Sequence, residues 1–105
     1  MSAVADKLDE ARKLIERGWT QEAYARGKSR RSVEEHGKAA VCFCALGALR
    51  RVTGNHWDNC PERDVLLRTI HCFDIIDWND HPQRTQAEVI DAFKRAAELA
   101  REQGL

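Results

Sequence analysis

The residues with the most obvious chemical potential are four cysteines and four histidines, which together could supply the ligands of a zinc ion. Structural zinc sites usually hold Cys-x₂₋₄-Cys pairs, whereas one residue separates Cys42 from Cys44. On a helix, residues two apart point about 200° away from each other, so these two thiols would not share an ion. His71 and Cys72 are adjacent and also diverge. We therefore expect no metal site and no cofactor. The other residues of this kind are His36, His56, Cys60 and His81.

Cys44 is the candidate for a catalytic thiol. It falls in the first turns of an expected helix, where the helix dipole lowers the pKa of a thiol. One of the histidines would act as the base, and Asn79 or Asp80 would orient it. The alternative is that Cys44 packs beside Ala48 as a small apolar residue. Sequence proximity does not establish catalytic geometry, so we favour packing and keep a thiol-dependent hydrolase or transferase as an alternative.

A basic stretch at 26–31 is the candidate for nucleic-acid binding, because Lys and Arg neutralise phosphates. Glu34 and Glu35 follow at once, and the whole chain has 17 basic and 17 acidic residues. A solvated loop is therefore favoured, and a nucleic-acid binder stays an alternative. The basic residues are Arg26, Lys28, Arg30 and Arg31.

The segment from Trp78 to Thr85 combines turn-forming residues with residue types common in interfaces. We favour an ordered turn that fixes the last helix, and we expect Asp80 to form an ion pair with Arg26 or Arg84. If the protein has a partner surface, aromatic and arginine side chains are expected to dominate it. The candidates are Arg30, Arg31, Trp57, Trp78 and Arg84.

The composition is that of a globular protein, with 43% hydrophobic and 32% charged residues in a chain of 105. This length suits one domain over residues 1–105 with one hydrophobic core. The N-terminal sequence is charged and lacks the apolar stretch of a signal peptide. We therefore expect a cytoplasmic protein with reduced thiols, and no membrane-spanning segment.

Hydrophobic periodicity predicts helices at 3–17 and at about 39–53. Gly18 is expected to end the first helix in the left-handed conformation. The second shows a broad apolar face that includes Val41 and Cys42. Between them, 27–38 reads as an exposed loop, and two short strands flanking it are compatible with the pattern.

Two more helices are indicated near the C-terminus. Pro61 suits the first position of a helix that runs to about Cys72. Thr85 and Glu88 form the capping box of the last helix, which ends before Gly104. Residues 73–84 have no clear assignment. The expected fold is mainly α, a bundle of about four helices with room for a short β-hairpin between the first two.

Three segments resemble a family of short, uncharacterised proteins from bacteria and their phages. They are GWTQEAYAR at 18–26, AVCFCALGALR at 40–50 and WNDHPQRTQAEVIDAF at 78–93. The matching motifs are G-W-x-Q-x-x-x-A-R, C-x-x-G-A and W-N-D-x-P-x-R-T-x-x-E-V. The resemblance supplies no catalytic assignment, and His81 occupies a variable position of the third motif.

The preferred hypothesis is a non-enzymatic protein-binding module that acts by surface complementarity. The phage context implied by the resemblance suggests an inhibitor of a host defence system, with a host protein or protein complex as partner. Nucleic acid is the less favoured partner because the chain has no net charge.

Overall fold

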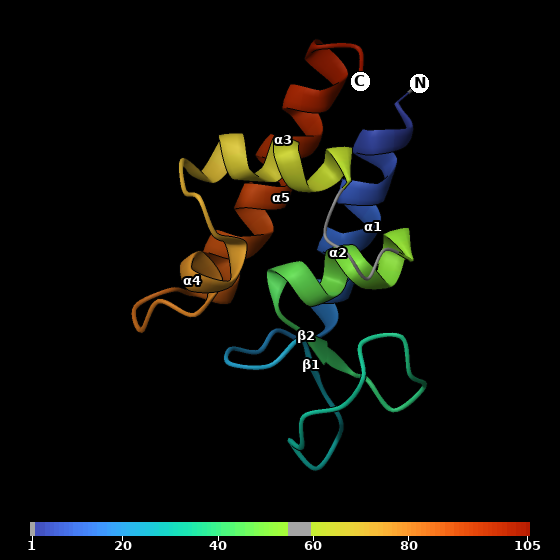
Figure 1. Ribbon diagram of the computed structural model, residues 1–105, viewed down its shortest axis with the longest axis vertical. Coiled ribbons are helices and arrows are strands. Elements are labelled where there is room, and N and C mark those ends of the chain that lie inside the picture. Colours follow the sequence, from blue (N-terminus) through green and yellow to red (C-terminus); the bar gives the residue numbers. More distant parts are fainter. Residues whose placement is uncertain (1, 55–59) are drawn as a thin grey trace.

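The computed structural model describes residues 2–54 and 60–105, and in these ranges it is mainly helical (Figure 1). Five helices and one two-stranded hairpin make up the described part, which confirms the predicted fold class. In chain order they are α1 (Ala3–Arg17), β1 (Ala25–Arg26), β2 (Cys42–Phe43), α2 (Ala45–Thr53), α3 (Pro61–Ile70), α4 (Ile75–Asn79) and α5 (Gln86–Glu102).

The core lies mainly between α1 and α5, which run antiparallel so that the two chain ends meet at one end of the molecule (Figure 1). Both helices present small residues to each other, which lets their axes approach closely. Leu8 and Ile15 on α1 and Phe93 on α5 are the largest fully buried side chains of this contact. Burial of each contributes roughly 1.5–3 kcal/mol. None of these helices, nor any other in the described ranges, has both the length and the apolar character needed to cross a membrane.

The predicted hairpin is confirmed, and it shortens the second helix. Strands β1 and β2 are antiparallel, with Ala25 opposite Phe43, and they flank the loop at 27–38. The helix expected from about residue 39 begins only at Ala45. The reason is long-range: the N–H of Phe43 donates to the carbonyl of Gly18 at 3.0 Å, and the N–H of Val41 donates to that of Arg26 at 2.9 Å. These bonds hold the segment extended, and Val41 is 38% exposed instead of facing the core.

Gly18 ends α1 differently from the prediction. Its φ of −177° is extended and not left-handed. The glycine is required by packing instead, because a Cβ there would lie 2.6 Å from the carbonyl oxygen of Val41. Absence of a side chain therefore lets the end of α1 touch the segment that leads into β2.

In the C-terminal half, α3 and α5 begin where their predicted capping residues place them. Pro61 occupies the first turn of α3, which ends at Ile70 with His71 in the left-handed conformation at φ 53°. Asp74 caps the short helix α4, in the segment that had no assignment, by accepting hydrogen bonds from the N–H groups of Ile76 and Asp77. The capping box of Thr85 and Glu88 at the start of α5 is present as predicted.

Candidate functional site

Asn79 is the centre of a buried polar network that joins three distant segments. Its side chain is completely buried, and Oδ1 accepts hydrogen bonds from Trp19 Nε1 at 2.8 Å and from the N–H of Ala45 at 3.0 Å. Its Nδ2 donates to the carbonyl of Thr20 at 3.1 Å and to Asp80 Oδ1 at 2.9 Å. An amide side chain has two donor and two acceptor positions, so the capacity of Asn79 is fully used. The network fastens α4 to the start of α2 and to the segment after α1 (Figure 1).

Neighbouring residues complete the same connection. Gln21 Nε2 donates to the carbonyl oxygens of Asn79 and His81 at 3.0 and 2.8 Å. Asp80 Oδ1 also accepts from the N–H of Glu22 at 2.9 Å, and Glu22 has a left-handed φ of 63°. The polar residues of the first and third motifs therefore bond mainly to the protein itself.

Arg84 and Trp78 form a second structural contact. The guanidinium of Arg84 lies 4.2 Å from the Trp78 ring centroid, and its Nε donates to the Trp78 carbonyl at 2.9 Å. Arg84 also pairs with Glu88 at 3.3 Å. Both side chains are partly buried, so they brace the start of α5, in agreement with the ordered turn expected here.

The predicted ion pair of Asp80 with Arg26 or Arg84 is wrong within the described residues. Arg26 donates instead to Thr20 Oγ1 at 2.8 Å and to the carbonyls of Gln21 and Arg30 at 3.2 and 2.8 Å. These three oxygens accept hydrogen bonds from the Arg26 guanidinium and lie within six residues of it in the chain. Arg26 thus holds the loop after β1, whereas Arg30 and Arg31 are exposed on that loop.

Cys44 occupies the N-cap of α2 and is only 3% exposed. Its Sγ accepts a hydrogen bond from the N–H of Gly47 at 3.2 Å. Burial raises the pKa of the Cys44 thiol to about 11, and the nearby charge of Asp80 acts in the same direction. The expected lowering by the helix terminus is therefore wrong, because desolvation outweighs the backbone hydrogen bonds. Near neutral pH the residue is a protonated cap.

Alkylation of Cys44 at neutral pH is expected to be slow. With a pKa of about 11, the thiolate fraction at pH 7.5 falls roughly a hundredfold below that of an ordinary thiol. Peptide mapping after timed iodoacetamide treatment, in buffer and in urea, measures this directly. Cys72, which is partly exposed, is the internal control. Equal rates for Cys44 in the folded and unfolded chain would contradict the assignment.

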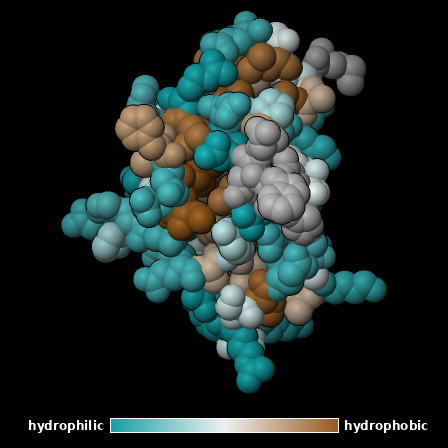
Figure 2. All heavy atoms as spheres, viewed as in Figure 1, coloured by the Kyte–Doolittle hydropathy of each residue, from teal (hydrophilic) through white to brown (hydrophobic). Residues whose placement is uncertain are grey.

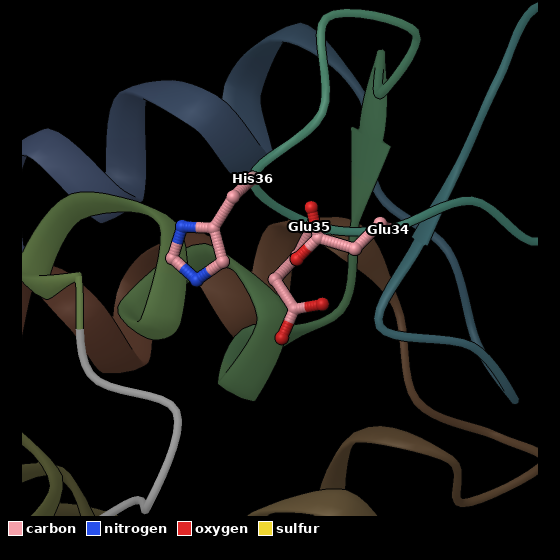
Figure 3. A group of neighbouring side chains, drawn as sticks. All are labelled: Glu34, Glu35 and His36. Carbon is pink, nitrogen blue, oxygen red and sulfur yellow. The ribbon is translucent and has the colours of Figure 1, made fainter.

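Glu34, Glu35 and His36 bring ligand-type atoms within 4.8 Å of one another (Figure 3). Glu35 is already engaged, because its carboxylate lies 3.1 Å from Arg50 Nη1. Burial pushes the pKa of Glu35 up, but hydrogen bonds from its backbone N–H and from Arg50 outweigh this and hold it below its usual range. A cation here would displace an existing ion pair, so we do not assign a metal to this group.

Phe73 is the most conspicuous departure from the burial pattern, since its side chain is 99% exposed. It follows α3 and borders a hollow of about 690 Å³, which we call the Phe73 surface, lined by Leu67, Arg68, His71, Cys72 and Phe73. Figure 2 shows hydrophobic residues gathered where α3 turns toward α4. Arg68 donates to Gln103 at 3.2 Å and forms no ion pair with the described part of the chain. The surface thus combines apolar area with unneutralised positive charge.

The structure disperses the partner residues expected from sequence. Arg30 and Arg31 lie on the loop after β1, Trp78 lies on α4, Arg84 lies in the turn before α5, and Trp57 lies outside the described residues. Phe73 was missed. It stands two residues before the apolar pair Ile75 and Ile76, so the sequence alone did not distinguish an exposed ring from part of a buried run.

Comparison with known proteins identifies a family and no function. Residues 1–99 match the model of DUF6197, which is described as a family of unknown function. Neither the curated proteins nor the solved structures include a significant match to the chain.

Proposed function

This chain belongs to DUF6197, and we propose that it is a non-enzymatic protein-binding module whose docking site is the Phe73 surface. The observation that carries the proposal is the full exposure of Phe73 in a chain whose other two phenylalanines are buried. Exposed aromatic rings next to arginine are the residue types that contribute most to binding between proteins. Exposing this ring to water has no structural benefit within the described chain.

The charge of the Phe73 surface indicates which residue types a partner protein would present to it. Arg68 and His71 border the hollow, and its described lining contains no carboxylate. The nearby Asp74 is directed to the backbone of α4, where its Oδ1 accepts hydrogen bonds at 2.8 and 3.2 Å. Complementary charge therefore favours a partner protein that presents an apolar side chain flanked by Asp or Glu.

We favour the enzyme alternative less, because the Cys44 thiol is buried and burial raises its pKa to about 11. In the nucleic-acid alternative, Arg26 is occupied by protein oxygens, which leaves Lys28, Arg30 and Arg31 exposed on a mixed-charge loop. We therefore rank protein binding first. We further propose, from the resemblance, that the partner is a bacterial host protein of a defence system and that the protein acts in the cytoplasm.

Replacing Phe73 with Ser is expected to abolish partner capture without affecting the fold. Loss of a central aromatic contact weakens binding roughly tenfold or more. Removal of a fully exposed ring changes the free energy of unfolding by less than about 0.5 kcal/mol. The measurement is pull-down from bacterial lysate with the tagged wild-type and F73S proteins, followed by titration of the identified partner and thermal unfolding of both.

Leu105→Ser is the matched control, since Leu105 is also an exposed hydrophobic residue and lies away from the hollow. The proposal is supported if wild type and L105S capture the same stoichiometric partner and F73S does not. The Arg68→Gln variant should bind that partner more weakly than wild type does. Recovery of the same proteins by wild type and F73S, or of no stoichiometric partner by wild type, would refute the proposal.

A further inference from the structure

A second pocket, separate from the Phe73 surface, lies where three segments meet beside the start of α2. Its volume is about 420 Å³, within the range of small-molecule sites. We call it the Glu22 pocket. Its lining residues come from the segment before β1, the loop after it, the N-cap of α2, and α4; they are Glu22, Ala23, Tyr24, Ser32, Cys44, Ile76 and Asp80.

The charge of the Glu22 pocket is entirely negative within its described lining. Glu22 is exposed, and no hydrogen bond or ion pair engages its carboxylate within the described residues. Asp80 uses Oδ1 for the N–H of Glu22 and for Asn79 Nδ2, both at 2.9 Å, which leaves Oδ2 without a described partner. Arg50 stacks on the Tyr24 ring at 4.1 Å, but its charge is paired with Glu35 at 3.1 Å. Glu22 and Asp80 thus both line this space, and neither carboxylate forms an ion pair within the described residues.

The rest of the lining suits a short hydrocarbon body. Ala23, Ile76 and the Tyr24 ring supply apolar contact, and Cys44 adds a thiol that stays neutral near pH 7. The rim is also fixed in place, because the hydrogen bond from Glu22 to Asp80 holds the backbone of Glu22 in its left-handed conformation at φ 63°. A preformed site loses less entropy on binding than a flexible one.

We propose that the Glu22 pocket binds an organic cation, an ammonium or guanidinium group on a short alkyl or aryl body. The charged group would lie between the carboxylates of Glu22 and Asp80, and the body would contact Ala23, Tyr24 and Ile76. A free amine and the side chain of a Lys or Arg from another protein share this chemistry. This site shares no residue with the Phe73 surface, so its test is independent of the proposed function.

The test follows backbone amide shifts of the ¹⁵N-labelled protein by NMR during titration with four probes. Benzylamine represents a free amine, and the methylamides of Nα-acetyl-arginine and Nα-acetyl-lysine represent protein side chains. Benzyl alcohol is the neutral control of the same shape. We expect saturable shifts at Glu22, Ala23 and Ile76 with at least one cation, and binding of benzyl alcohol that is at least about fivefold weaker than that of benzylamine.

Variants distinguish an effect of the carboxylate charges on binding from an effect on the fold. Glu22→Gln removes one charge from an exposed side chain and is expected to weaken cation binding about fivefold, whereas Glu34→Gln, an exposed carboxylate outside the pocket, leaves it unchanged. Asp80→Asn keeps an oxygen for the Glu22 and Asn79 hydrogen bonds, so E22Q/D80N tests loss of both charges. Saturable shifts by benzylamine only, or by the amino-acid amides only, support the site and identify the source of the cation. Equal binding of benzyl alcohol, equal binding to E22Q, or no saturable shift with any cation would overturn the proposal.

Discussion

Replacement of Asn79 by Leu is expected to lower the free energy of unfolding by about 3–5 kcal/mol, although the two side chains share the same branching and number of heavy atoms. The change leaves the Nε1–H of Trp19 and the N–H of Ala45 without their acceptor, and the carbonyl of Thr20 without its donor. Each buried polar group left unpaired costs about 1–3 kcal/mol. Urea denaturation followed by tryptophan fluorescence and by far-ultraviolet circular dichroism measures the loss.

Two further variants make this test specific to the network. Asn79→Asp keeps the acceptor for Trp19 and Ala45 but replaces the donor and adds a charge beside Asp80, so it too should destabilise the protein. Gln83→Ala removes an exposed amide from the same turn and should leave stability within about 0.5 kcal/mol of wild type. An N79L protein that is as stable as Q83A would show that the network contributes little.

Gly47→Ala is the second change with a large expected effect. A Cβ at this position would lie 1.9 Å from the carbonyl oxygen of Tyr24, which also accepts the N–H of Cys44 at 3.1 Å. The obstacle is backbone held by that hydrogen bond, so a side-chain rotation does not relieve it. Separation of the segment before β1 from α2 should cost about 3 kcal/mol. The melting temperature is then expected to fall by roughly 10–20 °C.

The matched control is Gly27→Ala. Its Cβ would lie 3.3 Å from the carbonyl of Ala39, a tight contact that small shifts relieve. We therefore expect G27A to melt within a few degrees of wild type, as measured by differential scanning fluorimetry and circular dichroism. A G47A protein with a melting temperature equal to that of G27A would contradict the close approach of the two segments.

The Asn79 and Gly47 tests also bear on how the three sequence motifs should be interpreted. Trp19 and Gln21 of the first motif, Gly47 of the second and Asn79 of the third contact one another or the backbone of a neighbouring motif. Loss of function after mutation of these residues would therefore report loss of the fold. Substitutions at Phe73 and Glu22 are better probes of function, because both side chains are exposed and no hydrogen bond within the described chain engages them.

The helices that could be predicted from the amino-acid sequence are those whose signals are local. Periodicity located α1 over 3–17, Pro61 located the start of α3, and the capping box of Thr85 and Glu88 located the start of α5. These features depend on side chains three or four residues apart, which meet on one helix face whatever the rest of the chain does.

The start of α2 and the character of both candidate sites depend on contacts between segments that are distant in the chain. The segment at 41–43 has helical periodicity, yet hydrogen bonds to Gly18 and Arg26 hold it extended. The buried amide of Asn79 is satisfied by distant partners, among them Trp19, 60 residues earlier in the chain, which donates to its Oδ1. Phe73 is exposed because α3 ends at Ile70 and the chain turns outward before α4. Each outcome depends on which distant backbone groups become neighbours, and residue spacing along the chain does not encode that information.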